Sequence, residues 1–229
     1  MDSNRCVEIP DSLDDITAAA IANPGMAAWA GLVVRGALKA GQTVMINGAT
    51  GTAGRLTAQL AKHLGAGTVM ATGRNAEELE ELKKLGADVV VPFALPEGGD
   101  GFEKRLKGIF ANGIDLVIDY LWGESARRIV VALAQTVAEK PVRFVQIGSA
   151  AGEPTLALSG TVLREAAIEL VGSGLGSVST ERLLQGISDV FERVQAAGLK
   201  IATQVHPLSE VAEVWARASG RPRVVFAIQ

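Results

Sequence analysis

The residues best placed to do chemistry stand in a glycine-rich turn that follows the apolar run 44–46. Gly48, Gly51 and Gly54 are spaced three apart in this turn. Backbone N–H groups at the start of a helix are free to bind an anion, and glycine lets a pyrophosphate approach them closely. Because Ala49 replaces the first glycine of the dinucleotide fingerprint, an ordinary strand–turn–helix is the alternative. We expect a dinucleotide site built from the turn residues Gly48, Ala49, Thr50, Gly51, Thr52, Ala53 and Gly54.

A second candidate group follows the next apolar run, 68–72, which ends in Gly73, Arg74 and Asn75. In an NAD site this strand end carries an Asp or Glu that binds the ribose 2′-hydroxyl, but Arg74 stands here instead. A guanidinium suits a 2′-phosphate through paired hydrogen bonds. The three residues therefore favour NADP(H) over NAD(H), and a solvated arginine in an ordinary loop is the alternative.

Strands and helices that alternate along the chain must position these residues. β-Branched runs predict strands at 43–47, 67–72, 88–91, 114–119, 142–147 and 168–171. Helical patterns predict helices at 53–64, 75–85, 101–111, 124–138 and 180–197. Such alternation is typical of βαβ units with a parallel sheet. The predicted fold class is therefore α/β: a Rossmann-type doubly wound parallel sheet of about six strands with helices on both faces.

Two flanking segments complete a predicted division into three parts. Residues 1–41 should form an extended segment and two helices, at 13–22 and 26–35, which Asn23-Pro24-Gly25 separates. Residues 42–200 should form the NADP-binding domain. Residues 201–229 should add a short strand–helix–strand appendage that ends in the strand 223–228.

Composition argues against several other functions. The 229 residues are 4% aromatic, with a net charge of -3 and no basic block, so nucleic acid is not an expected partner. No apolar run approaches the length of a membrane-spanning helix, so no membrane partner is expected. No metal is expected, because the few soft ligands are Cys6, His63 and His206. One cysteine and an N-terminus without a signal peptide indicate a cytoplasmic protein.

Six segments have a characteristic order and spacing along nearly the whole chain. They are 23–29 (NPGMAAW), the glycine turn, 85–88 (LGAD), 117–119 (VID), 148–149 (GS) and 207–211 (PLSEV). In this order they resemble the medium-chain dehydrogenase/reductase superfamily, most closely its zinc-free quinone-oxidoreductase-like branch. Members carry a β-rich catalytic half before this point. The resemblance implies that the sequence is the nucleotide-binding half: a shortened chain, a truncated gene product or one segment of a longer protein.

The resemblance adds two groups to the expected site, both at carboxyl ends of strands, where open α/β sheets bind ligands. Asp119, Tyr120 and Leu121 follow the fourth strand, where the family binds adenosine and ribose; a buried Tyr–Leu–Trp cluster is the alternative. Gly148, Ser149 and Ala150 follow the fifth strand, where the family approaches the nicotinamide; a plain loop is the alternative.

The implied reaction is hydride transfer from NADPH to a small-molecule quinone, enone or other carbonyl substrate. No catalytic acid or base is recognisable, and a non-catalytic NADP(H)-binding sensor or interaction module is the alternative. Arg221 and Arg223 stand where the resembling family often has a lysine before the last strand. They are expected to be surface charges, and contact with the cofactor is the alternative. Without a β-rich half, the last strand, 223–228, should have an unpaired backbone. The family also pairs the sixth strand across a dimer axis, so we expect a homodimer through that strand.

Overall fold

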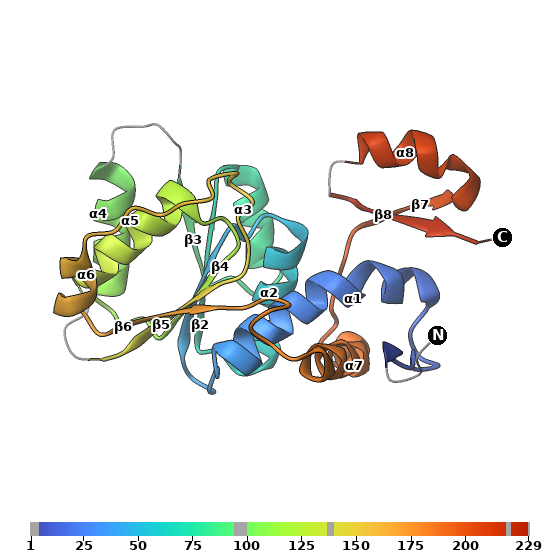
Figure 1. The fold of residues 1–229 in the computed structure, drawn as a ribbon, viewed down its shortest axis with the longest axis horizontal. Coiled ribbons are helices and arrows are strands. Elements are labelled where there is room, and N and C mark those ends of the chain that lie inside the picture. The colour runs from blue at the N-terminus through green and yellow to red at the C-terminus, as the bar shows by residue number, and fades with distance from the viewer. Residues whose placement is uncertain (1–4, 94–99, 137–139, 219–220, 229) are drawn as a thin grey trace.

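The computed structural model describes residues 5–93, 100–136, 140–218 and 221–228. Its main feature is a six-stranded sheet in which all neighbouring strands are parallel (Figure 1). The strands are β1 (Thr43–Asn47), β2 (Thr68–Gly73), β3 (Val89–Pro92), β4 (Leu116–Asp119), β5 (Val142–Gln146) and β6 (Ile168–Gly172). Their order is β3-β2-β1-β4-β5-β6, which reverses direction between β1 and β4. The predicted doubly wound fold is confirmed.

Helices cover both faces of this sheet. One face carries α1 (Asp15–Trp29), the π-helix η2 (Ala30–Arg35), α2 (Thr52–His63), α3 (Ala76–Lys83) and α7 (Thr180–Ala196). The other carries α4 (Asp100–Phe110) and α5 (Gly123–Ala134), and α6 (Gly160–Glu165) contacts α5. Successive strand residues point to opposite faces, so Val44 belongs to the first core and Met45 to the second. Burial on both faces explains why the inner strands β1, β2 and β4 are mostly apolar.

The two helices next to the glycine turn end and begin where the sequence predicts. Gly65 follows α2 with φ at +86°, in the left-handed region that glycine adopts without strain. The Asn75 side chain caps α3 by accepting from the backbone N–H groups of Glu77 (2.9 Å) and Glu78 (3.2 Å). Gly65 thus ends α2, and Asn75 begins α3.

The prediction of two separate N-terminal helices is wrong, because α1 continues through Pro24 and passes directly into η2. A proline removes one backbone hydrogen bond, but here α1 is packed against both α2 and α7. Gly25 permits the approach of α7, since a Cβ at that position would lie 2.8 Å from the Val190 Cγ1. Tertiary packing thus outweighs two helix-breaking residues.

The continuous helix also corrects the expectation about apolar length. Asp15–Arg35 has 21 residues and, by length and composition alone, could cross a membrane. However, 56% of its most apolar window is buried inside the protein. Ala20 and Ile21 are fully buried. The apolar character of this helix is therefore accounted for by its place in the core.

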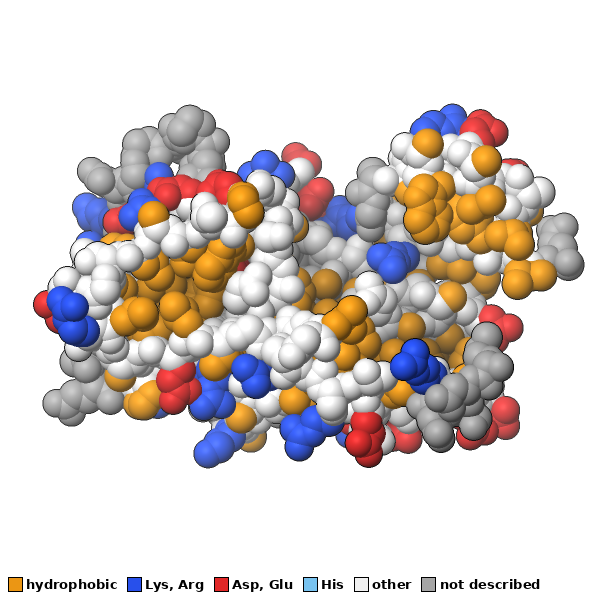
Figure 2. All heavy atoms as spheres, viewed as in Figure 1, with side chains coloured by type: hydrophobic (Ala, Val, Ile, Leu, Met, Phe, Trp, Pro, Cys, Tyr) orange, Lys and Arg blue, Asp and Glu red, His pale blue; other side chains and the backbone are white. Residues whose placement is uncertain are grey.

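A second, two-stranded sheet forms near the C-terminus. β7 (Thr203–Pro207) pairs in parallel with β8 (Arg223–Ala227), and η3 (Leu208–Glu210) and α8 (Val211–Arg217) lie between them in the chain. Figure 1 shows this unit beside α1 and apart from the large sheet. The expectation of an unpaired last strand is wrong, because β8 bonds to β7 and Val225 is buried. Figure 2 shows hydrophobic side chains gathered on this unit. Its exposed large hydrophobic residues include Val205, Leu208 and Trp215.

Candidate functional site

A cleft of about 600 Å³ opens at the carboxyl ends of β1, β2, β4 and β5, where the strand order reverses. It is lined by Gly48, Thr50, Gly51, Thr52, Ala53, Gly54, Gly73, Arg74, Phe93, Tyr120, Leu121, Gly148, Ser149 and Ala150. The structure thus brings together in one cleft all of the predicted site residues except Ala49, Asn75 and Asp119. Four strand ends far apart in the sequence meet there, as the topology requires.

The three glycines of the turn differ in what the fold demands of them. Gly48 has φ at +86°, and Gly54 is fixed by packing, because an added Cβ would lie 2.5 Å from the Gly48 carbonyl oxygen. At Gly51 the φ of -70° suits any residue, and the nearest atom to an added Cβ is 3.7 Å away. The fold therefore needs Gly48 and Gly54, whereas Gly51 leaves free space that a ligand can occupy.

The first turn of α2 supplies hydrogen-bond donors to this space. Gly51 is the N-cap, and its carbonyl accepts the first intrahelical bond, from the Arg55 N–H (2.9 Å). The N–H groups of Thr52, Ala53 and Gly54 come before that bond, and these residues line the cleft. No acidic residue lies in the first turn of this helix, so no carboxylate there competes for its positive end. The arrangement suits an anionic ligand.

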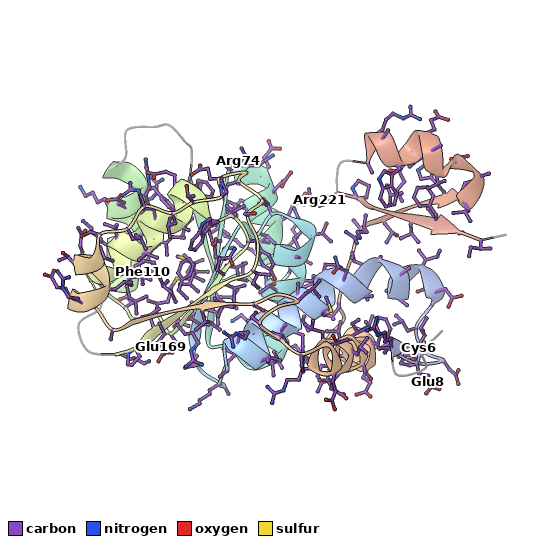
Figure 3. All side chains as sticks on the ribbon, in the orientation of Figure 1. Cys6, Glu8, Arg74, Phe110, Glu169 and Arg221 are labelled. Carbon is purple, nitrogen blue, oxygen red and sulfur yellow. The ribbon has the colours of Figure 1, made fainter. Side chains whose placement is uncertain are left out.

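Arg74 lines the cleft at the end of β2, with its side chain exposed near the start of α3 (Figure 3). The neighbouring Asn75 was expected in the site, but its side chain caps α3 instead. Ala49 is also outside the cleft: it is fully buried, and its N–H donates to the Thr72 carbonyl (2.9 Å). Asn75 and Ala49 therefore position the turn and the strand end around the cleft.

Beneath the cleft lies a network of buried polar side chains. Asn47 Nδ2 donates to Asp119 Oδ1 (2.7 Å) and to Ser125 Oγ (3.0 Å). Thr72 Oγ1 donates to Asn47 Oδ1 (2.8 Å). All four residues are buried. The network, which we call the floor, joins the ends of β1, β2 and β4 to the start of α5.

Asp119 was expected in the cofactor site; it does not line the cleft, and its side chain is fully buried in this floor. Its carboxylate also accepts from the backbone N–H groups of Leu121 (3.1 Å) and Trp122 (3.1 Å). Burial raises the pKa of Asp119 to about 6, although the hydrogen bonds from Asn47 and the two N–H groups favour the charged form. Asp119 thus orients the loop that presents Tyr120 and Leu121 to the cleft.

Tyr120 lines the cleft, and its hydroxyl is bonded within the protein. The hydroxyl lies 2.6 Å from Thr57 Oγ1, which itself donates to the Ala53 carbonyl (2.8 Å). The Tyr120 hydroxyl therefore donates to Thr57. Burial raises the pKa of Tyr120 above its usual range, so the phenol stays neutral at ordinary pH. This pair joins the end of β4 to the first turns of α2.

Sequence reasoning missed one lining residue and misjudged a nearby one. Phe93 follows β3, lines the cleft and packs against Phe102, with ring centroids 5.3 Å apart. Its place after the third strand could have indicated it, since the other strand ends were used in the same way. Arg221 was expected to be a surface charge, but it donates to the Thr50 carbonyl of the glycine turn (3.2 Å). No local sequence signal indicated that contact.

Within the described ranges, no group of three or more His, Cys, Asp or Glu side chains comes together to hold a metal ion. The soft ligands are separated: Cys6 is in the N-terminal segment, His63 ends α2 and His206 lies in β7. His206 Nδ1 is 2.8 Å from Glu210 Oε2, which is a local contact across the β7–η3 junction. The residues described here do not form a zinc centre, so we derive no step through a metal.

Residues 53–191, more than half of the chain, match the zinc-binding dehydrogenase family. The chain belongs to this family. This match confirms the sequence resemblance at the level of the medium-chain dehydrogenase/reductase superfamily.

Relatives of this family include named reductases. The chain is 29% identical over 214 residues to the "Probable NADPH-dependent quinone reductase tdiC" of Emericella nidulans, covering 90% of this chain and 59% of that protein. It is 35% identical over 123 residues to prostaglandin reductase 1 of Sus scrofa, covering 53% of this chain and 36% of the relative. The chain therefore spans little more than half the length of the first of these relatives.

Solved structures share the fold. The 2-haloacrylate reductase structure has a TM-score of 0.80 at 23% identity and covers 97% of this chain and 69% of its own. The structure of mycobacterial Rv1454c complexed with NADPH has a TM-score of 0.74 at 21% identity and covers 96% and 66%. At these identities the likeness concerns the arrangement of helices and strands.

Proposed function

We propose that this chain binds NADP(H) in the cleft and forms the cofactor-binding part of a reductase that acts on quinones, enones or related carbonyl compounds. The observation that carries the proposal is the cleft itself, with free space over Gly51 at the start of α2 and Arg74 at the end of β2. The relatives named NADPH-dependent quinone reductase and prostaglandin reductase 1 support the same class of reaction.

The charged groups of such a cofactor fit the cleft at two places. The N–H groups of the first turn of α2 would hold the pyrophosphate over Gly51, where an added side chain would intrude. The Arg74 guanidinium would pair with the 2′-phosphate through charge-assisted hydrogen bonds. At the end of β5, Gly148, Ser149 and Ala150 are small and leave room for a ring. These contacts bind and orient; none of them requires a metal.

When bound, NADPH supplies a hydride, and the chain's own residues hold it in place. Tyr120 stays neutral with its hydroxyl bonded to Thr57, and Asp119 lies in the floor below the cleft. Neither is placed to exchange a proton with a substrate. We therefore assign no catalytic acid or base to the described residues and assign the proton that completes the reduction to solvent. The proposed setting is cytoplasmic.

A non-catalytic NADP(H)-binding module is the second candidate. It is favoured by a cleft whose described residues bind rather than react. Such a module would sense the reduced cofactor or present it to a partner. The two candidates share the cofactor site and differ only in turnover.

Two measurements test the proposal. Titration calorimetry with NADPH and NADH should show tighter binding of NADPH; equal affinities, or no binding of either nucleotide, would contradict it. NADPH oxidation is then followed by absorbance with a panel of quinones and enones. Turnover supports the reductase, whereas tight NADPH binding without turnover supports the module.

A further inference from the structure

Two arginines from distant parts of the chain bind the same carbonyl of the glycine turn. Arg55 Nε, from α2, donates to the Thr50 carbonyl oxygen (3.1 Å), and Arg221 donates to the same oxygen (3.2 Å). Arg221 is 171 residues away from Thr50 and stands just before β8. Figure 3 shows it between the large sheet and the C-terminal unit. Hydrogen bonds from charged donors are stronger than neutral ones, so this carbonyl is firmly oriented.

Both guanidiniums are anchored on α3. Arg55 pairs with Glu81 (2.9 Å), and Arg221 pairs with Glu78 (3.3 Å). The Glu78 N–H is one of the two that Asn75 caps, so this ion pair lies at the start of α3, next to Arg74. Arg221 therefore connects the start of β8 to the glycine turn and to the start of α3 at once.

Arg221 contacts the glycine turn from outside the cofactor cleft. Arg221 and Arg55 line a second pocket of about 520 Å³, which shares only Thr52 with the cleft. Neither arginine lines the cofactor cleft, whereas Thr50 does. Arg221 is thus placed to set the geometry of the turn without itself touching a ligand.

Loss of the contact between Arg221 and the turn would act on the cleft through Thr50. Its carbonyl faces the two arginines, while its side chain packs over Gly73, where an added Cβ would lie 2.6 Å from Thr50 Cγ2. The same residue precedes the N-cap Gly51, whose N–H donates to the Gly48 carbonyl (3.4 Å). Releasing the Thr50 carbonyl would therefore loosen the turn on both sides of the proposed pyrophosphate position.

We propose that Arg221 is a positioning residue of the cofactor site, which makes nucleotide affinity depend on the β7–β8 unit. This inference rests on the proposed function for its ligand. Since Arg221 orients the turn that binds the pyrophosphate, it serves NADPH and NADH alike. Arg74, at the 2′-phosphate position, serves NADPH alone. The two arginines thus have separable effects.

The test compares Arg221→Ala with Arg223→Ala in the full chain. Arg223 has the same charge and starts β8, where its backbone N–H donates to the Ala202 carbonyl (2.7 Å), so it is the matched control. For Arg221→Ala, we expect the Kd of NADPH and of NADH to rise by the same factor, roughly three- to tenfold, because Arg55 still donates to the Thr50 carbonyl. Arg223→Ala should leave both unchanged. Arg221→Lys, which keeps one donor, should recover part of the loss.

Hydrogen exchange on the protein without nucleotide gives an independent readout. The amides of residues 48–54 should exchange faster in Arg221→Ala than in the parent, and Glu78→Gln should give a smaller change in the same direction. This measurement tests the contact even if the parent chain binds neither nucleotide, a result that would defeat the proposed function. Loss of NADPH affinity alone, or unchanged affinities for both nucleotides, would overturn the inference, and so would unchanged exchange at 48–54 in a chain that binds neither nucleotide.

Discussion

The rim of the cleft, where Arg74 and the open space over Gly51 lie, differs from the floor in how its polar groups find partners. In the floor, the polar groups of Asn47, Thr72, Asp119 and Ser125 bond to one another and are shielded from water. At the rim, Arg74 is exposed and the space over Gly51 is open. A buried polar group without a partner is costly, so the floor must be complete before any ligand arrives. The rim can leave donors open because water satisfies them until a ligand binds.

The largest expected effect is on stability, and it distinguishes Gly54 from Gly51. A side chain at Gly54 would meet the backbone of Gly48 and Ala49 at 2.5–2.6 Å, and backbone cannot move aside cheaply. Gly54→Val should therefore lower the free energy of unfolding by about 3 kcal/mol or more, measured in urea. Gly51→Ala is the control and should change stability little. Equal stability losses in both variants would remove the distinction drawn here between fold-required and ligand-required glycines.

The free energy of unfolding should also depend on pH because of Asp119 in the floor. The pKa of Asp119 is about 6 in the folded protein against a usual 3.8, so folding favours its protonated form. Protonated Asp119 therefore stabilises the folded protein fully below about pH 4. This stabilisation, about 2–3 kcal/mol, is lost as pH rises through 6. Urea unfolding of the parent and of Asp119→Asn between pH 4 and 7 should show a difference that changes over this window. A constant difference would mean that the carboxyl titrates normally.

At the rim, Gly51→Val should spare the fold and destroy the site. Its branched side chain would occupy the position proposed for the pyrophosphate, so nucleotide affinity should fall about a hundredfold, equivalent to about 2.7 kcal/mol. Calorimetry measures the affinity, and circular dichroism checks that the protein remains folded. A folded variant that binds NADPH as tightly as the parent would place the nucleotide elsewhere.

The smallest expected effect concerns selectivity. Arg74→Ala removes one charge-assisted contact to the 2′-phosphate, so NADPH affinity should fall about tenfold or more, while NADH affinity stays constant. The ratio of the two Kd values is the quantity to measure. A parallel loss for both nucleotides would instead assign Arg74 to the shared part of the cofactor.

Much of the large sheet and most of the cleft follow from local sequence. Apolar runs followed by glycine or polar residues located the ends of β1, β2, β4 and β5, and parallel topology places such ends along one edge. Local signals could not reveal that Pro24 stays helical, because that depends on packing against residues of α7. They also could not show that Asp119 turns inward, since its partner Asn47 lies 72 residues away. The contact of Arg221 with the Thr50 carbonyl could not be predicted for the same reason, since the two residues are 171 positions apart.

The pairing of α1 with α7 sets an order on folding during synthesis. Gly25 abuts Val190, the Arg193 guanidinium lies 4.7 Å from the Trp29 ring centroid, and Gln195 Nε2 donates to the Ser12 carbonyl (2.7 Å). Every strand end around the cleft has been made before α7 leaves the ribosome. All residues that line the cleft have therefore been synthesised while α1 still lacks its contacts with α7. Until residue 196 has emerged, the apolar side of α1 is the surface that a chaperone would meet.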